Sequence, residues 1–124
     1  MRPIPHQMLR HTVTLRVPTG MDAYHVVQYE DVQLNRVCLQ RSLTTNKRNA
    51  YGAQNTEAAF NATLFVDARL STPKGIVLDA LKRRADAAGS DVRVIYGGCD
   101  YAVKSVEVYL DDRAQVHHYE AGLV

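Results

Sequence analysis

At 124 residues the chain is long enough for one hydrophobic core and too short for two ordinary domains, so we expect a single domain over residues 1–124. Its hydrophobic fraction of 46% is ordinary, and no apolar run approaches the roughly 20 residues that a membrane span needs. A formal net charge of +2 is too small for a protein whose main task is to grip nucleic-acid phosphates.

The first residues contain two X-Pro pairs, Arg2-Pro3 and Ile4-Pro5, which disfavour helix and predict an extended arm over residues 1–9. They lack the apolar stretch of a signal peptide, so we expect none. Residues 11–17 then alternate apolar and polar side chains, which is typical of a half-buried strand. The Pro-Thr-Gly sequence at 18–20 is expected to end that strand.

Residues 24–41 remain rich in β-branched and aromatic side chains, but their apolar phase changes twice. It shifts between Tyr29 and Val32, and again between Leu34 and Val37. Because one extra residue exchanges the two faces of a strand, each shift predicts a bulge or a bend. Bends of this kind are typical of a small closed or rolled sheet.

Residues 42–57 are polar, have no periodicity and lie between two strand-like segments, so we expect a long loop there. Several polar and basic side chains at its start could meet a nucleic-acid backbone without reading its sequence. They are Arg41, Asn46, Lys47, Arg48, Asn49 and Tyr51. On the residues alone, a solvated polar loop explains these side chains better.

The clearest strand is predicted over residues 60–70, where apolar side chains occupy every second position and Phe65 is the exception on the polar side. Residues 72–75 break it. Residues 76–88 then carry apolar side chains at helical spacing with basic residues late in the segment, which predicts one short helix capped by Gly89.

The remaining chain predicts more strands. Residues 92–96 and 101–110 flank Gly97-Gly98, a pair suited to a tight primed hairpin turn. A last strand is expected over residues 116–124. The chain is therefore expected to be mainly β, with a small six-stranded barrel or rolled antiparallel sheet, one short helix and a long loop.

No residue pattern indicates catalysis or metal binding. His117 and His118 are neighbours on an expected strand, and such side chains should point to opposite faces and not share one ion. Cys38 and Cys99 lie in strand-like segments and are expected to be buried thiols in a reducing compartment. We expect no enzyme, no metal site and no cofactor.

Several short segments together resemble the minor capsid protein family of tailed bacteriophages and prophages. They are Met1-Arg2-Pro3-Ile4-Pro5, Leu9-Arg10-His11-Thr12-Val13-Thr14, Ala62-Thr63-Leu64-Phe65-Val66-Asp67, Ser71-Thr72-Pro73-Lys74-Gly75, and His117-His118-Tyr119-Glu120-Ala121 with Leu123-Val124. The resemblance extends over nearly the whole chain in the right order. The helix-like stretch after Gly75 departs from the turn-like pattern expected of the family.

The resemblance implies a virion protein similar to the connector or stopper proteins that form a homo-oligomeric ring at the head-to-tail junction. Such a ring is assembled in the host cytoplasm and has portal and adaptor proteins above, tail proteins below and packaged double-stranded DNA in its channel. It further implies that the 42–57 loop faces this channel and helps to retain the DNA.

The two ends of the chain are the expected contacts to neighbouring subunits, adaptor or tail, because extended termini commonly dock on sheet edges. The residues in question are Arg2, Pro3, Ile4, Pro5, His117 and Tyr119. Alternatively, the C-terminal strand simply closes its own domain.

Two other functions remain open. A tail-completion or tail-tube protein would share the β architecture. A single-stranded nucleic-acid-binding β-barrel would need exposed aromatic residues beside basic ones. The chain has no tryptophan, and Phe65 is the one aromatic residue out of phase on the clearest strand.

Overall fold

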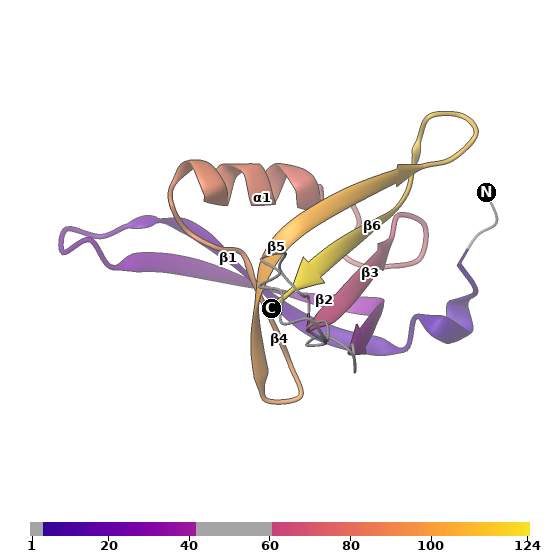
Figure 1. Ribbon diagram of the computed structural model, residues 1–124, viewed down its shortest axis with the longest axis horizontal. Helices are drawn as coiled ribbons and strands as arrows, with labels where there is room; N and C mark the ends of the chain where they lie inside the picture. Colours follow the sequence, from indigo (N-terminus) through magenta and orange to yellow (C-terminus); the bar gives the residue numbers. More distant parts are fainter. Residues whose placement is uncertain (1–3, 42–60) are drawn as a thin grey trace, which may run out of the picture.

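The computed structural model describes residues 4–41 and 61–124 of the chain (Figure 1). The predicted 42–57 loop lies outside these residues. The elements are a 3-10 turn, η1 (His6–Met8), the strands β1 (His11–Met21), β2 (Val27–Arg41), β3 (Ala62–Asp67), β4 (Arg93–Tyr96), β5 (Cys99–Leu110) and β6 (Val116–Leu123), and the helix α1 (Leu78–Ala87). The prediction of a mainly β chain with one short helix is confirmed.

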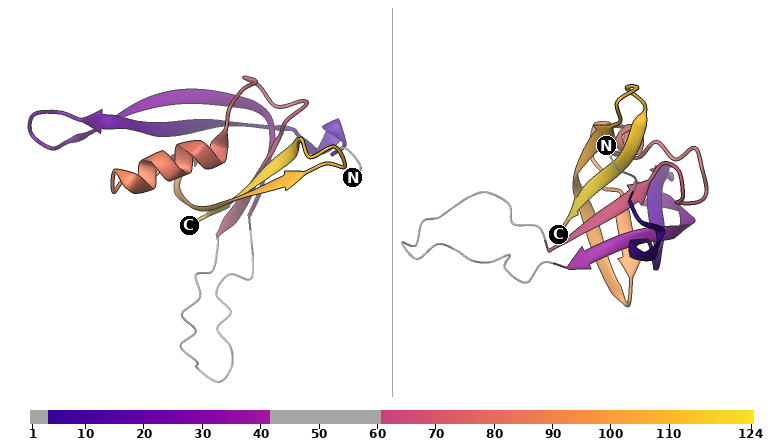
Figure 2. Two further views of the ribbon diagram at one scale, coloured as in Figure 1. Left: turned by 90° about the horizontal axis from the view of Figure 1, so that it is seen from above. Right: turned by 90° about the vertical axis from the view of Figure 1, so that its right-hand side faces the viewer.

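The six strands form one closed antiparallel sheet in the order β1-β2-β3-β6-β5-β4, with β4 pairing back to β1 (Figure 2). Its closure is short, because β1 and β4 pair only through Thr14–Ile95, Leu15–Val94 and Arg16–Arg93. The sheet is an irregular barrel, since β1 and β2 extend well beyond the part that closes. This confirms the expected small barrel or rolled antiparallel sheet.

The core lies inside the closed sheet and under α1. Leu15, Leu34, Leu64 and Leu123 are at most 1% exposed, and burial of each such side chain stabilises the fold by about 1.5–3 kcal/mol. The helix packs against β5 and β1 and adds two buried side chains, Leu78 and Ala85. It thereby covers core residues that the strands alone would leave open.

The helix ends as the sequence predicts. The N–H of Ser90 donates to the carbonyl of Ala85 at 2.9 Å, and the N–H of Gly89 donates to the carbonyl of Asp86 at 3.0 Å. Gly89 has a φ of +73°, so this is a Schellman motif with glycine in its usual position. The helix begins at Leu78 and not at residue 76, because Val77 has the non-helical angles φ −107° and ψ 88°.

The β4–β5 hairpin also confirms the prediction. Tyr96 pairs with Cys99, and the two residues between them, Gly97 and Gly98, have φ values of +59° and +80°. Two consecutive positive φ angles define the primed turn that fits the twist of a hairpin, and glycine adopts them without a steric penalty.

Two expectations for β1 and β2 are wrong. β1 does not end at Pro18 but continues to Met21, because this part of β1 pairs with β2 on one side only and an edge strand tolerates proline. The first expected bulge, between Tyr29 and Val32, does not occur in β2; the extra residue is Thr19 in β1. The second is confirmed at Arg36, whose φ is +60°.

The strand predicted over residues 60–70 ends early, at Asp67. The Asp67 Oδ1 atom accepts the backbone N–H groups of Arg69 at 2.7 Å and Leu70 at 3.0 Å, so the chain turns directly after the strand. The expected extended arm is also only partly extended. Residues 6–8 form the 3-10 turn, in which the N–H of Met8 donates to the carbonyl of Pro5 at 3.0 Å, and residues 1–3 lie outside the described chain.

Candidate assembly surfaces

One end of the closed sheet is where the segment 42–60 leaves and re-enters the fold. Arg41, the last residue of β2, pairs with Ala62, the first residue of β3. The guanidinium of Arg41 lies 6.0 Å from the centre of the Tyr96 ring, and its Nη2 donates to the Sγ of Cys99 at 3.7 Å. Arg41 is thus held against the β4–β5 hairpin at this end.

His11 supports the same arrangement from β1. Its Nδ1 accepts the backbone N–H of Leu39 at 3.0 Å, and its ring meets the ring of Tyr96 edge to face at 5.3 Å. Because Nδ1 is the acceptor, the imidazole carries its proton on Nε2 when neutral. Tyr96 therefore contacts both His11 and Arg41.

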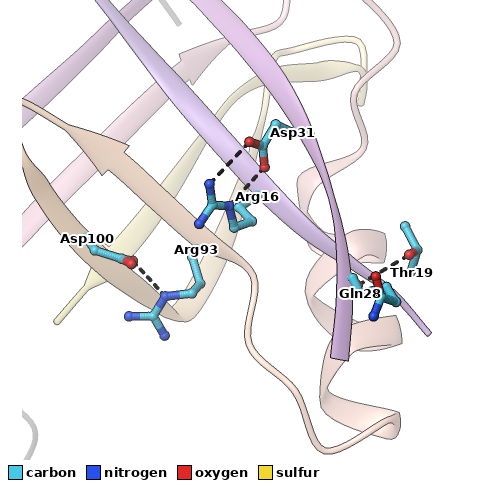
Figure 3. A network of polar contacts seen from close by, with 6 residues as sticks. All are labelled: Arg16, Thr19, Gln28, Asp31, Arg93 and Asp100. Atoms are coloured by element: carbon cyan, nitrogen blue, oxygen red, sulfur yellow. Dashed lines mark hydrogen bonds and ion pairs between the residues drawn. The ribbon is translucent and has the colours of Figure 1, made fainter. Parts of the chain in front are cut away.

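A row of four charged side chains crosses the outer face of β2, β1, β4 and β5 (Figure 3). Arg16 binds Asp31 through two contacts of 2.9 and 3.2 Å, and Arg93 binds Asp100 at 2.6 Å. The hydrogen bond from Arg16 lowers the pKa of Asp31, and the same bond raises the pKa of Arg16. The row is neutral, so it does not form an anion-binding surface.

The β1–β2 hairpin projects from the body of the molecule, as Figures 1 and 2 both show. Its far end, here called the hairpin tip, carries four exposed apolar side chains. They are Met21, Tyr24, Val26 and Tyr29, which are 53%, 85%, 55% and 41% exposed. Several large apolar side chains exposed within one short segment are a candidate interaction surface.

The turn of the hairpin tip is closed by hydrogen bonds. The Oδ1 atom of Asp22 accepts the backbone N–H groups of Tyr24 at 2.8 Å and Val26 at 3.0 Å, and the N–H of Asp22 donates to the carbonyl of Val26 at 3.0 Å. Next to the turn, β1 and β2 are also hydrogen-bonded at the Thr19 bulge, where Thr19 Oγ1 donates to the Gln28 carbonyl at 3.3 Å (Figure 3). These bonds hold the backbone from which the apolar side chains project.

A groove of about 330 Å³ separates the hairpin from α1, which lies alongside it in Figure 2. The groove is mainly apolar. Its apolar walls include Val17, Val32, Ile76, Leu81 and Ala85, and its charged lining residues are Glu30 and Arg84. This groove, called the α1 groove below, opens beside Met21 and is thus continuous with the hairpin tip.

His117 and His118 do not point to opposite faces, contrary to the sequence expectation. A register shift in the β5–β6 pairing leaves His117 as an extra residue, and the Nδ1 atoms of the two rings lie 2.8 Å apart. His118 Nε2 also lies 2.9 Å from Glu120, and its ring stacks on Tyr109 at 4.7 Å. Within residues 4–41 and 61–124, no group of three or more His, Cys, Asp or Glu side chains is placed to hold a metal ion.

The expected contact residues at the two ends fall in different environments. Ile4 is half-buried and its carbonyl accepts Arg69 Nη2 at 3.5 Å, whereas Pro5 is exposed; Arg2 and Pro3 lie outside the described residues. His117 is half-buried. Tyr119 is 5% exposed inside the core, where burial raises its pKa. β6 pairs with β3 and β5 on its two edges, so the C-terminal strand closes its own sheet.

Of the expected loop residues, the structure describes only Arg41. Asn46, Lys47, Arg48, Asn49 and Tyr51 lie in the undescribed segment. The cysteines are both free, as expected, but only Cys38 is buried, and burial raises the pKa of its thiol. The expectation of a buried Cys99 is wrong, because this residue follows the two-glycine turn at an exposed hairpin end.

Sequence reasoning missed the hairpin tip. Its apolar residues were assigned to strands on their β-branched and aromatic character, which does not separate core positions from exposed ones. The available signal was the segment 21–29 itself, where apolar and aromatic residues occur without a two-residue alternation. Such a pattern is inconsistent with a strand that has one buried face.

The described part of the chain contains no helix that is long and apolar enough to cross a membrane. A family model described as "Minor capsid protein" matches residues 5–123 of the chain. No curated protein matches it.

Proposed function

The chain belongs to the minor capsid protein family and is thus a structural bacteriophage protein, and we propose that its copies form a ring in the neck, where the DNA-filled head joins the tail. Family membership indicates a structural role in the virion. In the proposed location the ring contacts portal or adaptor proteins on one side and tail proteins on the other.

The hairpin tip is the observation that carries this proposal. Four apolar side chains that are 41–85% exposed, on a hydrogen-bonded turn, are costly for a protein that remains alone in water. A protein built into an assembly buries such a surface against its neighbours. Identical copies that meet through two different surfaces generate a closed ring when the rotation between them closes.

We further propose that the 42–57 segment faces the channel of this ring and helps to retain the packaged DNA. Support comes from Arg41, which is exposed at the start of the segment and makes no ion pair within the described residues. One arginine is a weak attraction for phosphate, but a ring repeats it in every copy. Ile4, Pro5 and His117 remain the proposed contacts to adaptor or tail proteins.

The location is tested by deleting the gene from the parent phage and viewing the lysate by negative-stain electron microscopy. Unjoined tails beside heads that are separate or empty support the neck ring, and the wild-type gene supplied in trans should restore virions. Intact virions from the deletion would refute it. Filled heads with absent or malformed tails would instead favour a tail-completion or tail-tube protein.

DNA retention is tested separately by replacing residues 42–57 with a short glycine-serine linker. The paired ends of the segment, Arg41 and Ala62, are neighbours in the sheet, so a short linker can span them. We expect the variant to fold and to give joined particles that have lost DNA. Joined particles with a full DNA content would contradict the retention role and leave the neck location intact.

A further inference from the structure

The hairpin tip needs a partner that covers apolar side chains, and the described chain does not supply one within a single copy. The tip lies at the far end of the projecting hairpin, away from the core (Figure 1). Tyr24 is 85% exposed and Val26 is 55% exposed. Both side chains therefore remain in water until another molecule covers them.

A second copy of the same chain offers an apolar surface that could cover the tip. The α1 groove is an apolar cleft of about 330 Å³ that no described residue fills. Leu81 and Ala85 on α1 and Val17 on β1 form part of its walls. The volume suits one or two apolar side chains of an incoming turn.

The groove is lined by one negative and one positive side chain, Glu30 and Arg84, and the positive one can pair with an acidic residue of the tip. Asp22 is the only acidic residue between Met21 and Tyr29, a segment without Lys or Arg. On α1, Lys82 is paired with Asp86 and Arg83 with Asp79, whereas Arg84, which lines the groove, has no ion pair within the described residues. An incoming hairpin tip would place its acidic residue near this free cation.

We propose that the hairpin tip of one copy docks in the α1 groove of the next copy, with Tyr24 and Val26 against the apolar walls and Asp22 toward Arg84. The contact joins two different surfaces, so it propagates from copy to copy. It rests on the proposed function only in assuming that copies assemble with one another. One tip and one groove are small beside the ~800 Å² per partner of a stable pair, so isolated chains remain monomeric and the contact forms in the assembly.

The contact is tested by disulfide crosslinking between two variants, Tyr24→Cys and Ala88→Cys, made in a Cys99→Ser background. Ala88 is exposed and lines the groove, and Cys38 is buried, so the introduced thiols are the reactive ones. The two variants are supplied together during phage production, and purified particles are oxidised and analysed by denaturing gel. We expect a product of twice the chain mass. With both substitutions on one chain, we expect a ladder of multiples.

The matched control replaces Ala88→Cys by Arg113→Cys. Arg113 is exposed in the β5–β6 turn, at the opposite end of the molecule from the hairpin tip. This control should give no crosslinked product with Tyr24→Cys. Tyr24→Asp, at a side chain that is almost fully exposed, should leave the thermal unfolding temperature of the purified chain unchanged while it abolishes incorporation into particles.

Three results would overturn the docking. They are particles that contain the chain but give no Tyr24–Ala88 product, a product formed only between two Tyr24→Cys chains, and a product with a different virion protein. The proposed neck location fails by a different result, namely intact virions from the gene deletion. A ladder of crosslinked chains in particles, together with intact virions from the gene deletion, would therefore support the contact and reject the location.

Discussion

The turn that follows β3 is tied to the bulge in β2 by one buried hydroxyl, and its removal gives a measurable loss. Ser71 is 4% exposed; its Oγ accepts the N–H of Asp67 at 2.9 Å and donates to the carbonyl of Arg36. In Ser71→Ala the N–H of Asp67, a residue only 3% exposed, loses its partner. An unsatisfied buried backbone group costs about 1–3 kcal/mol.

The second lost bond costs less. Arg36 is an exposed residue, so water can replace the Ser71 hydroxyl at its carbonyl, which leaves a net loss of about 0.5–1 kcal/mol. Together the two losses amount to about 1.5–4 kcal/mol, a large share of the ~5–15 kcal/mol that stabilises a domain. Urea unfolding of the purified chain, with a slope of about 1–3 kcal/mol/M, should show a midpoint about 1–2 M lower.

Ser105→Ala is the matched control. Ser105 is a half-buried serine on β5 whose hydroxyl makes no hydrogen bond within the described residues, so its loss should change stability by less than about 0.5 kcal/mol. Equal urea midpoints for the two variants would refute the reasoning, because the Ser71 hydroxyl would then contribute no more to stability than a hydroxyl without hydrogen bonds inside the protein.

Three further predictions follow from the described contacts. Gly97→Ala should lower the free energy of unfolding by about 1 kcal/mol in urea titration, because Gly97 has a φ of +59° and its added Cβ would lie 3.4 Å from Arg41 Nη2; an unchanged midpoint would contradict the turn geometry. The backbone N–H groups of Gln115 and Arg113 lower the pKa of Asp111 from its ordinary value of 3.8, so the stability from this carboxylate is present above that value and is lost as the pH falls through the lowered one. Asp111→Asn should therefore have a lower unfolding temperature than the wild type at neutral pH and a smaller further loss in acid, as followed by circular dichroism; parallel curves for both proteins would exclude this contribution. In a thiol-labelling assay the exposed Cys99 should react at once and the buried Cys38, whose pKa is raised, only on unfolding; two fast thiols would contradict the fold around Cys38.

Local backbone chemistry was predictable from the sequence where glycine decides the conformation. Gly89 at the end of α1 and the pair Gly97-Gly98 in the β4–β5 turn all have positive φ angles, and few other residues adopt these. These two glycine motifs therefore predict their own backbone conformation. The strand β6 was also predictable, from its residues, although the bulge at His117 was not.

Features that depend on distant partners were not predictable in this way. Pro18 continues β1 because the strand has one open edge there, and Asp67 ends β3 because its side chain accepts N–H groups from the next turn. His117 and His118 meet on one side because the partner strand shifts register at Tyr109. None of these partners can be read from the segment that carries the feature.

The hairpin tip escaped prediction for a related reason. Alternation along a strand identifies a buried face, but both faces of a projecting ribbon meet water, so Tyr24 and Val26 carry no periodic mark of their exposure. The pairing of Arg16 with Asp31 likewise depends on the register that the Thr19 bulge sets between β1 and β2. These surface features thus depend on strand register more than on residue type.

The short β1–β4 closure gives the molecule a seam. Three residue pairs hold it, against ten between β1 and β2, and the two ion pairs of the charged row lie over it on the outside (Figure 3). Because few hydrogen bonds must break there, we expect the sheet to open at this seam before the β3–β6 pairing opens, so that the amide hydrogens of β4 exchange with solvent ahead of those in β3 and β6. On the β1 side, these three pairs are the strand pairing that joins the projecting hairpin to the rest of the sheet.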